Sequence, residues 1–96
     1  SDRLKNEGNI RIQDAKDYAI SYVDLKGDEI SNEDIATIYP IFSILNDYDN
    51  LIEILNLSIS RDDSNLEYLE VLRSAYMGKK DYENAERIYQ MILSAE

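Results

Sequence analysis

The chain has 96 residues, a formal net charge of −10 and a hydrophobic fraction of 44%. Its length and hydrophobic content suit one domain with a single core, and they argue against extended disorder despite the charge. The chain contains neither Cys nor His. Disulfides and thiol chemistry are therefore excluded, and the usual general base and the usual zinc ligand are missing.

The acidic charge also bears on partners and location. Phosphate groups would be repelled by this surface, so nucleic acid and anionic membranes are disfavoured as partners. No apolar run reaches the roughly 20 residues that span a membrane, and no signal-peptide pattern is visible. With the absence of Cys, this slightly favours the cytoplasm. The acidic residues indicate a solvated face or, as the alternative, a partner that carries Lys or Arg.

Apolar residues at three- and four-residue steps predict an all-α protein of about five helices, and no sustained two-residue alternation indicates a strand. The helices are predicted over residues 10–26, 32–45, 48–59, 65–77 and 82–94, with residues 1–9 as a frayed tail or a short helical turn. The first helix is expected to begin at the cap Asn9 and to end at Gly27. Its apolar stripe is Ile12, Ala15, Ala19, Tyr22 and Val23.

Residues 28–30 are read as a connector before the second helix, which begins with a capping segment at Ser31–Asp34. Pro40 lies inside this helix and predicts a kink between Ala36 and Tyr39, because proline lacks the backbone donor and clashes with the preceding turn. The predicted buried stripe is Ile35, Ile38, Phe42 and Leu45.

The last three helices are also marked by caps. Asp47 and Asp81 are expected to cap the third and fifth helices, and Ser64 with Glu67 the fourth. The segment 78–80, Gly-Lys-Lys, closes the fourth helix. The predicted inward residues are Leu51, Ile52, Leu55 and Ile59 on the third helix, Leu69, Leu72, Ala75 and Tyr76 on the fourth, and Ala85, Ile88, Tyr89, Ile92 and Leu93 on the fifth.

Part of the chain repeats after 34 residues. The segment 81–84 (Asp-Tyr-Glu-Asn) aligns with 47–50 (Asp-Tyr-Asp-Asn) at this offset. A fixed period of this size is typical of arrays of paired helices. The same offset aligns Ile35, Ile38 and Phe42 with Leu69, Leu72 and Tyr76, and Leu51, Leu55 and Ile59 with Ala85, Tyr89 and Leu93.

No motif in the chain indicates catalysis or metal binding. Segment 47–50 faintly suggests a calcium loop, but it lacks the required glycine and terminal glutamate, and capping explains both of its copies. No glycine-rich phosphate loop is present, and the acidic pair Asp62-Asp63 lies in a turn that offers no burial to raise a pKa. We therefore expect a non-enzymatic protein without cofactor or metal. An enzyme accessory or hydrolase fragment is the weaker alternative.

Several of the eight tyrosines invite an aromatic binding platform, but packing explains most of them. Tyr48 and Tyr82 occupy equivalent turn positions, and two others lie on predicted core stripes. Tyr39 and Tyr68 are less constrained by the pattern, which leaves an exposed position open for both.

The pattern Leu69-x-x-Leu72-x-x-x-Tyr76, followed by Ala85-x-x-x-Tyr89, resembles the tetratricopeptide repeat. The resemblance implies a right-handed stack of antiparallel helix pairs, a TPR-like solenoid. Residues 1–96 would form one domain, with an N-terminal helix over 9–27, a divergent repeat over 32–65 and a better match over 66–96. In the divergent repeat Ile35 replaces the usual tryptophan, Tyr39 a small residue and Leu51 an alanine, and Asp63 stands where proline is frequent.

The resemblance also implies a non-catalytic protein–protein interaction module whose first helices line a concave face. There the family's Lys- and Arg-based carboxylate clamp is absent, because Thr37, Glu67 and Val71 occupy those positions. A basic or amphipathic protein or peptide is the expected partner. The candidate partner-binding residues are Glu33, Thr37, Pro40, Ile44, Glu67, Glu70, Val71, Ser74 and Met77.

Two other interpretations remain open at this point. The candidate face is equally compatible with a merely solvated surface, since scattered exposed apolar residues are normal. The chain is also compatible with a structural, dimerisation or sensor domain of a larger regulator or secretion component. In that case self-association through the last helix is expected.

Overall fold

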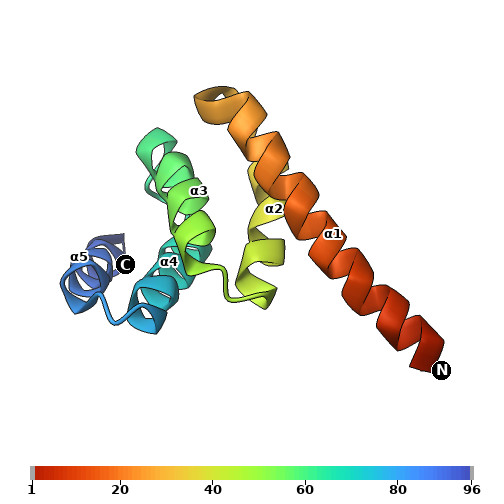
Figure 1. Cartoon of the computed structure of the whole chain (residues 1–96). Coiled ribbons are helices and arrows are strands. Elements are labelled where there is room, and N and C mark those ends of the chain that lie inside the picture. The colour runs from red at the N-terminus through yellow and green to blue at the C-terminus, as the bar shows by residue number, and fades with distance from the viewer. Residues whose placement is uncertain (1, 96) are drawn as a thin grey trace.

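The computed structural model describes residues 2–95, with side chains from residue 11 onward. Helices α1 (Asp2–Lys26), α2 (Asn32–Ile44), α3 (Tyr48–Arg61), α4 (Leu66–Gly78) and α5 (Tyr82–Ala95) are joined by short turns, the first of which contains the 3₁₀ segment η1 (Gly27–Glu29). No strand occurs between residues 2 and 95. Each helix packs against the next in sequence, so α1 and α5 lie at opposite ends of the molecule (Figure 1). The prediction of an all-α protein with five helices is confirmed.

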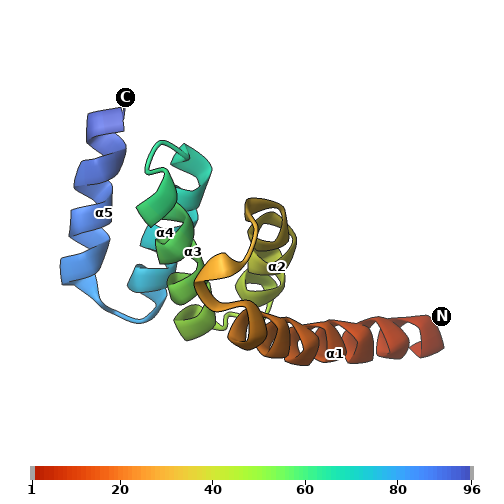
Figure 2. The same ribbon diagram turned by 90° about the horizontal axis from the view of Figure 1, so that it is seen from above.

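Helix α1 is longer than predicted. It begins at Asp2, so the expectation of a frayed tail or a single turn before a cap at Asn9 is wrong. Only Gly8 opposes helix in this segment, and one glycine costs about 1 kcal/mol relative to alanine. The N-terminal part of α1 projects beyond the other helices (Figures 1 and 2). Ile12 is consequently exposed, against the prediction, whereas Ala19 further along is buried.

The connection between α1 and α2 contains a core residue that the sequence pattern did not reveal. Gly27 has φ +54° and ends α1 as predicted. Ile30, expected to be part of a connector, is only 1% exposed. It directly precedes the cap Ser31, whose Oγ accepts the Asp34 N–H at 3.0 Å. Ile35 is also buried, so Ile30 and Ile35 occupy the two positions of a hydrophobic staple.

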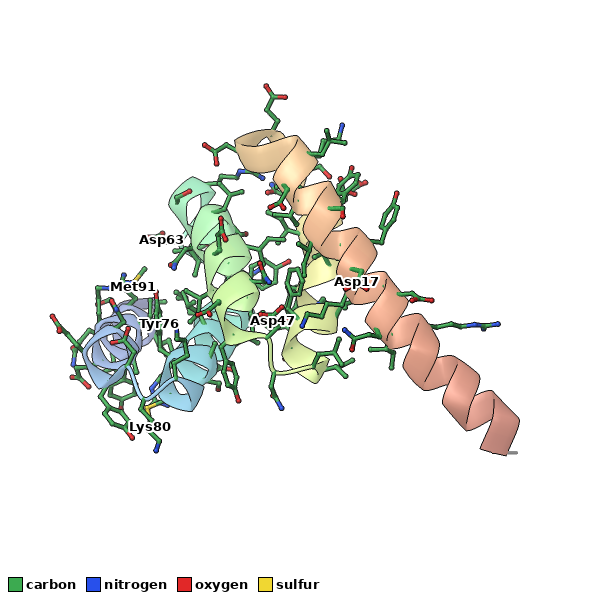
Figure 3. The ribbon with its side chains drawn as sticks, in the orientation of Figure 1. Asp17, Asp47, Asp63, Tyr76, Lys80 and Met91 are labelled. Carbon is green, nitrogen blue, oxygen red and sulfur yellow. The ribbon has the colours of Figure 1, made fainter. Side chains whose placement is uncertain are left out.

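The pairs α2–α3 and α4–α5 are built alike. Every helix boundary of the second pair lies 34 residues after its counterpart in the first. Both internal turns contain a non-glycine residue with positive φ, Asn46 at 53° and Lys80 at 61°. Asp47 and Asp81 follow them, and each donates its N–H over 2.9 Å to the carbonyl five residues earlier. Asp47 and Lys80 mark the two turns in Figure 3. The sequence repeat is therefore also a repeat of backbone geometry.

The predicted caps at the two turns are confirmed. Asp47 accepts the Asn50 N–H at 3.5 Å and its side-chain amide at 2.8 Å. Asp81 accepts the same two groups of Asn84 at 3.3 and 2.8 Å. These contacts satisfy amides at the helix N-terminus that have no partner within the helix.

The cap of α4 differs from the prediction. Asn65, not Ser64, accepts the backbone N–H of Tyr68, at 3.1 Å. Ser64 instead donates its N–H and hydroxyl to Asp62, at 2.9 and 2.6 Å. Because Asn and Ser are equally good caps and stand side by side here, the sequence did not distinguish them.

The predicted core is confirmed on α4 and only in part elsewhere, because Leu45 after α2 and Ile52 and Ile59 on α3 are half-buried rather than buried. Tyr89 and Leu93 were expected to be buried, but they are 39% and 45% exposed, because α5 packs on α4 and its opposite side is uncovered by any described residue. Ile54 is buried without having been predicted. Helix α2 continues through Pro40 as one helix, and the kink remains a prediction. The buried residues are Ala19, Ile30, Ile35, Ile38, Phe42, Leu51, Ile54, Leu55, Leu69, Leu72, Ala75, Tyr76, Ala85, Ile88 and Ile92.

Candidate functional site

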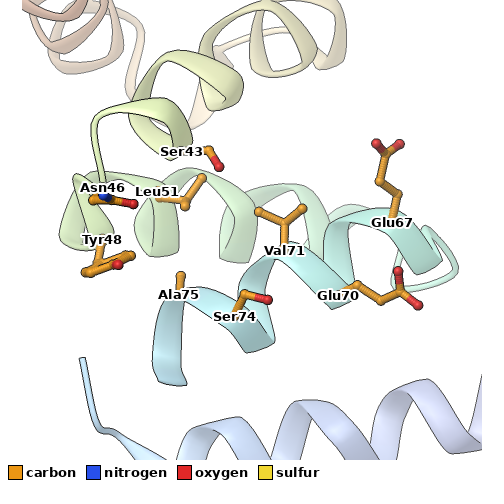
Figure 4. A pocket seen from close by; sticks show the side chains of 9 residues that line it. All are labelled: Ser43, Asn46, Tyr48, Leu51, Glu67, Glu70, Val71, Ser74 and Ala75. Carbon is orange, nitrogen blue, oxygen red and sulfur yellow. The ribbon is translucent and has the colours of Figure 1, made fainter. Parts of the chain in front are cut away.

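An open groove of about 350 Å³ lies where the end of α2 and the start of α3 face α4 (Figure 4). We call it the α4 groove. Acidic side chains stand at one end of it, and the turn between α2 and α3 closes the other (Figure 4). Its lining residues are Ser43, Asn46, Tyr48, Leu51, Glu67, Glu70, Val71, Ser74 and Ala75.

Helix α4 supplies one wall of the α4 groove. Glu67, Glu70, Val71 and Ser74 recur at the three- and four-residue steps that place side chains on one helix face. The two glutamates and Ser74 are exposed, and Val71 is half-buried. This wall therefore offers two carboxylates next to an apolar centre.

The floor of the groove is apolar, and a glycine determines the position of one of its rings. Leu51 and Ala75 line it and are almost fully buried. The ring of Tyr48 lies directly on Gly78, where an added Cβ would come within 2.5 Å of Tyr48 Cζ. A larger residue at position 78 would displace this ring, so Gly78 sets the position of Tyr48 in the floor.

An aromatic pair supports the acidic end. Tyr39 and Tyr68 pack edge to face with ring centroids 4.9 Å apart, and both are half-buried rather than exposed. The Tyr39 hydroxyl donates to Glu67 Oε1 over 3.4 Å. Burial, followed by the charge of Glu67, raises the pKa of both tyrosines above the usual value. These hydroxyls stay protonated at neutral pH, and that of Tyr39 remains a donor to Glu67.

Two lysines near the end of the groove opposite the glutamates already form salt bridges. Lys16 on α1 lies 3.4 Å from Asp47, and Lys79 forms a salt bridge with Asp49. Burial alone would raise the pKa of Asp47, but hydrogen bonds from Asn50 and the charge of Lys16 lower it overall. None of the nine lining residues is basic, so Glu67 and Glu70 give the groove its charge.

The structure brings together four of the nine residues predicted to bind a partner, namely those on α4 that line the groove. The other five lie outside it: Glu33, Thr37, Pro40, Ile44 and Met77. Thr37 donates to the Glu33 carbonyl at 3.1 Å and lines a separate cavity between α1 and α2. Ile44 and Met77 are 68% and 43% exposed.

Sequence reasoning missed the other five lining residues. Leu51 and Ala75 had been assigned to the core and Tyr48 to a turn, and Ser43 and Asn46 had been given no partner-binding role. A signal for Tyr48 was present, because the residue after the cap faces the following helix pair, where Gly78 leaves room for a ring. The sequence alone did not show that these two positions meet.

The groove combines acidic side chains with an apolar floor. Glu67 and Glu70 can attract a cationic side chain, and the apolar floor can take an aliphatic one. Among the side chains that the structure describes, those of residues 11–95, no three acidic, Cys or His residues are grouped to hold a metal ion. In the same span, no helix is long and apolar enough to cross a membrane.

Comparison of the chain with models of known families, and with curated proteins, finds no match in either case.

Proposed function

We propose that the chain is a non-catalytic protein–protein interaction module, and that its α4 groove binds an amphipathic segment carrying basic and apolar side chains. The observation that carries the proposal is the position of Glu67 and Glu70 beside an apolar floor in one groove. A volume of about 350 Å³ accommodates a few side chains rather than a whole domain. A short segment of a partner is therefore the fitting ligand.

The two parts of the groove have different tasks. Exposed ion pairs contribute only about 0.2–1 kcal/mol each, so Glu67 and Glu70 mainly govern orientation, association rate and salt dependence. Contact with Leu51, Val71 and Ala75 supplies the apolar share of the affinity. The ligand thus needs both kinds of side chain on one face.

The proposal includes the architecture that the sequence resemblance implies, in which the two helix pairs are tetratricopeptide-like repeats in a right-handed stack. It is supported by the common 34-residue offset of all helix boundaries, by the positive φ in both turns and by the matching Asp–Asn caps. In such a stack α2 and α4 line the concave face, and the α4 groove lies on it.

The test uses a 16-residue amidated peptide of Lys and Leu, designed as an amphipathic helix, and the double variant Glu67→Gln with Glu70→Gln. Glutamine retains an oxygen that can accept the hydrogen bond from the Tyr39 hydroxyl, so the packing around position 67 persists. Asp17→Asn with Glu53→Gln is the matched control, because it removes two exposed acids elsewhere and changes the net charge equally. Isothermal titration at several salt concentrations gives the affinity and its salt dependence.

We expect the groove variant to weaken binding about 3- to 10-fold and to flatten the salt dependence, with the control close to the unmodified chain. Backbone amide NMR shifts should move at Leu51, Val71 and Ser74. Equal losses in both variants would show attraction to the overall charge only and would refute the groove as the site.

A further inference from the structure

Helix α5 presents a row of exposed side chains that is apolar except for Glu86. We call Tyr82, Glu86, Tyr89 and Leu93 the α5 stripe, because they recur at three- and four-residue steps along one side of the helix. Tyr82 is 58% exposed, Tyr89 39% and Leu93 45%. The buried residues of α5 lie on a different side, which packs against α4. In Figure 1, α5 stands at the end of the row of helices.

The equivalent row on α3 is covered. At the 34-residue offset the α5 stripe corresponds to Tyr48, Ile52, Leu55 and Ile59, of which Leu55 is 0% exposed and the others are half-buried. Helix α3 packs between α2 and α4, and α2 is the counterpart of α4. Helix α5 thus has α4 on one side, as α3 has α2. On its other side, where α3 has α4, no described helix packs.

Arg73 supplies a second and independent observation. Its guanidinium lies over the ring of Tyr89, 4.9 Å from the centroid. Its Nε is buried and has no hydrogen-bond partner among the described residues. A buried donor without a partner is costly, and a charged one more so. A carboxylate arriving beside Tyr89 would pair with the charged guanidinium group to which this donor belongs.

The first helix pair shows where such a carboxylate would come from. The counterpart of Arg73 is Tyr39, which packs on Tyr68 and donates to Glu67 at the start of α4. A helix placed on α5 as α4 is placed on α3 would bring its own first-turn acid to Arg73. The other end of that helix would meet Tyr82, as Gly78 meets Tyr48.

We propose that the α5 stripe with Arg73 is a second interaction surface, and that it docks a helix of a partner protein with the residue pattern of α4. That helix carries an acid in its first turn for Arg73. Counted from this acid, apolar residues follow at the second, fifth and ninth positions and a glycine at the eleventh, as at Leu69, Leu72, Tyr76 and Gly78 after Glu67. The interface continues one that the chain already makes internally. It is independent of the α4 groove, whose ligand bears the opposite charge.

The test probe is a peptide of residues 64–80 with Ser74→Lys and a lactam bridge from that lysine to Glu70, since both positions are exposed in α4. The bridge is needed because isolated helices of this length are marginal in water. Its affinity for the whole chain is measured by fluorescence anisotropy. We expect Tyr82→Ser with Leu93→Ser to weaken binding at least tenfold.

Leu25→Ser with Ile44→Ser is the matched control for the stripe variant, because these residues are 80% and 68% exposed on other helices. The control should bind the peptide unchanged. The four substituted side chains are between 45% and 80% exposed, so the fold should persist, as circular dichroism can verify.

The charge pairing is tested by a double-mutant cycle. Glu67→Gln in the peptide should weaken binding about fivefold to the unmodified chain, which corresponds to about 1 kcal/mol, and less than twofold to Arg73→Gln. Arg73→Lys keeps the charge without the planar fork and should bind at an intermediate level.

Three results would overturn the proposal. The first is the absence of peptide binding at millimolar concentration, and the second is equal binding by the stripe variant. The third is a dimer of the unmodified chain that sedimentation detects and that the stripe variant abolishes, because the occupant would then be a second copy of the chain.

Discussion

The packing of α4 against α5 predicts that Ala85→Leu destabilises the protein. Ala85 is 3% exposed. If space were available, the three added carbons would contribute about 2.4 kcal/mol at ~0.8 kcal/mol for each buried methylene. The residue lies in a closely packed interior, where inserting carbons forces side chains off their rotamers. The expected net result is a loss of about 1–3 kcal/mol in the free energy of unfolding.

The first helix pair offers the reverse experiment. Leu51 stands 34 residues before Ala85 and is 2% exposed, so this pair accepts leucine where the second has alanine. Leu51→Ala removes the same atoms and leaves a cavity, which should cost about 2–5 kcal/mol. Two opposite changes at equivalent positions would then both destabilise, because each pair is packed for its own residue.

The unfolding free energy of both variants is measured by urea unfolding, followed by far-ultraviolet circular dichroism. The slope of this free energy against urea concentration should be the same as in the unmodified chain, which checks that the same transition is compared. An unfolding free energy for Ala85→Leu equal to or above that of the unmodified chain would refute the reasoning. It would show that the space around Ala85 is not filled.

Two further substitutions test the turns. Asp47→Ala should cost about 1 kcal/mol at neutral pH through the lost cap. Hydrogen bonds from Asn50 and the charge of Lys16 outweigh burial and lower the pKa of Asp47 in the folded state, so its contribution is present above the unfolded pKa. The difference from the unmodified chain should therefore shrink as pH falls below about 4, as urea titrations at several pH values can check. Lys80→Gly should raise the free energy of unfolding by about 0.5 kcal/mol, because the φ of 61° at this position suits glycine. An unchanged or lower Tm in calorimetry would contradict this prediction.

Features determined by neighbouring residues were predictable from the sequence. The caps Ser31, Asp47 and Asp81 are confirmed, because a cap requires only a short polar side chain and the amides that directly follow it. The starts of α2, α3 and α5 were predictable from these caps. The choice between Ser64 and Asn65 failed because two adjacent residues have equal capping ability.

Burial at the ends of the molecule was not predictable, because it depends on which helices are neighbours. Tyr89 continues the apolar pattern of α5 just as Leu55 does on α3, yet Leu55 is fully buried and Tyr89 is 39% exposed. Ile12 fails for the same reason, since the helix that carries it projects from the body. Periodicity identifies a helix face that can be buried, and tertiary contacts decide whether it is.

The candidate groove was half predictable for a related reason. Its α4 wall follows from helical periodicity, which places Glu67, Glu70, Val71 and Ser74 on one face. Its opposite side comes from residues more than 15 positions earlier, and their approach depends on the ring of Tyr48 lying on Gly78. Such a contact between the start of one helix and the end of another leaves no periodic signal in the sequence.

The two proposed surfaces differ in charge because of one difference between the helix pairs. Where the first pair has Tyr39, which donates to Glu67 within the chain, the second has Arg73, whose Nε has no partner among residues 11–95. A tyrosine hydroxyl is satisfied by one acceptor, whereas a guanidinium carries a permanent charge and five donors. An internal contact with Glu67 therefore suits the neutral residue. Arginine at the same position suits contact with an external carboxylate, and for this reason we propose a binding surface at the second helix pair.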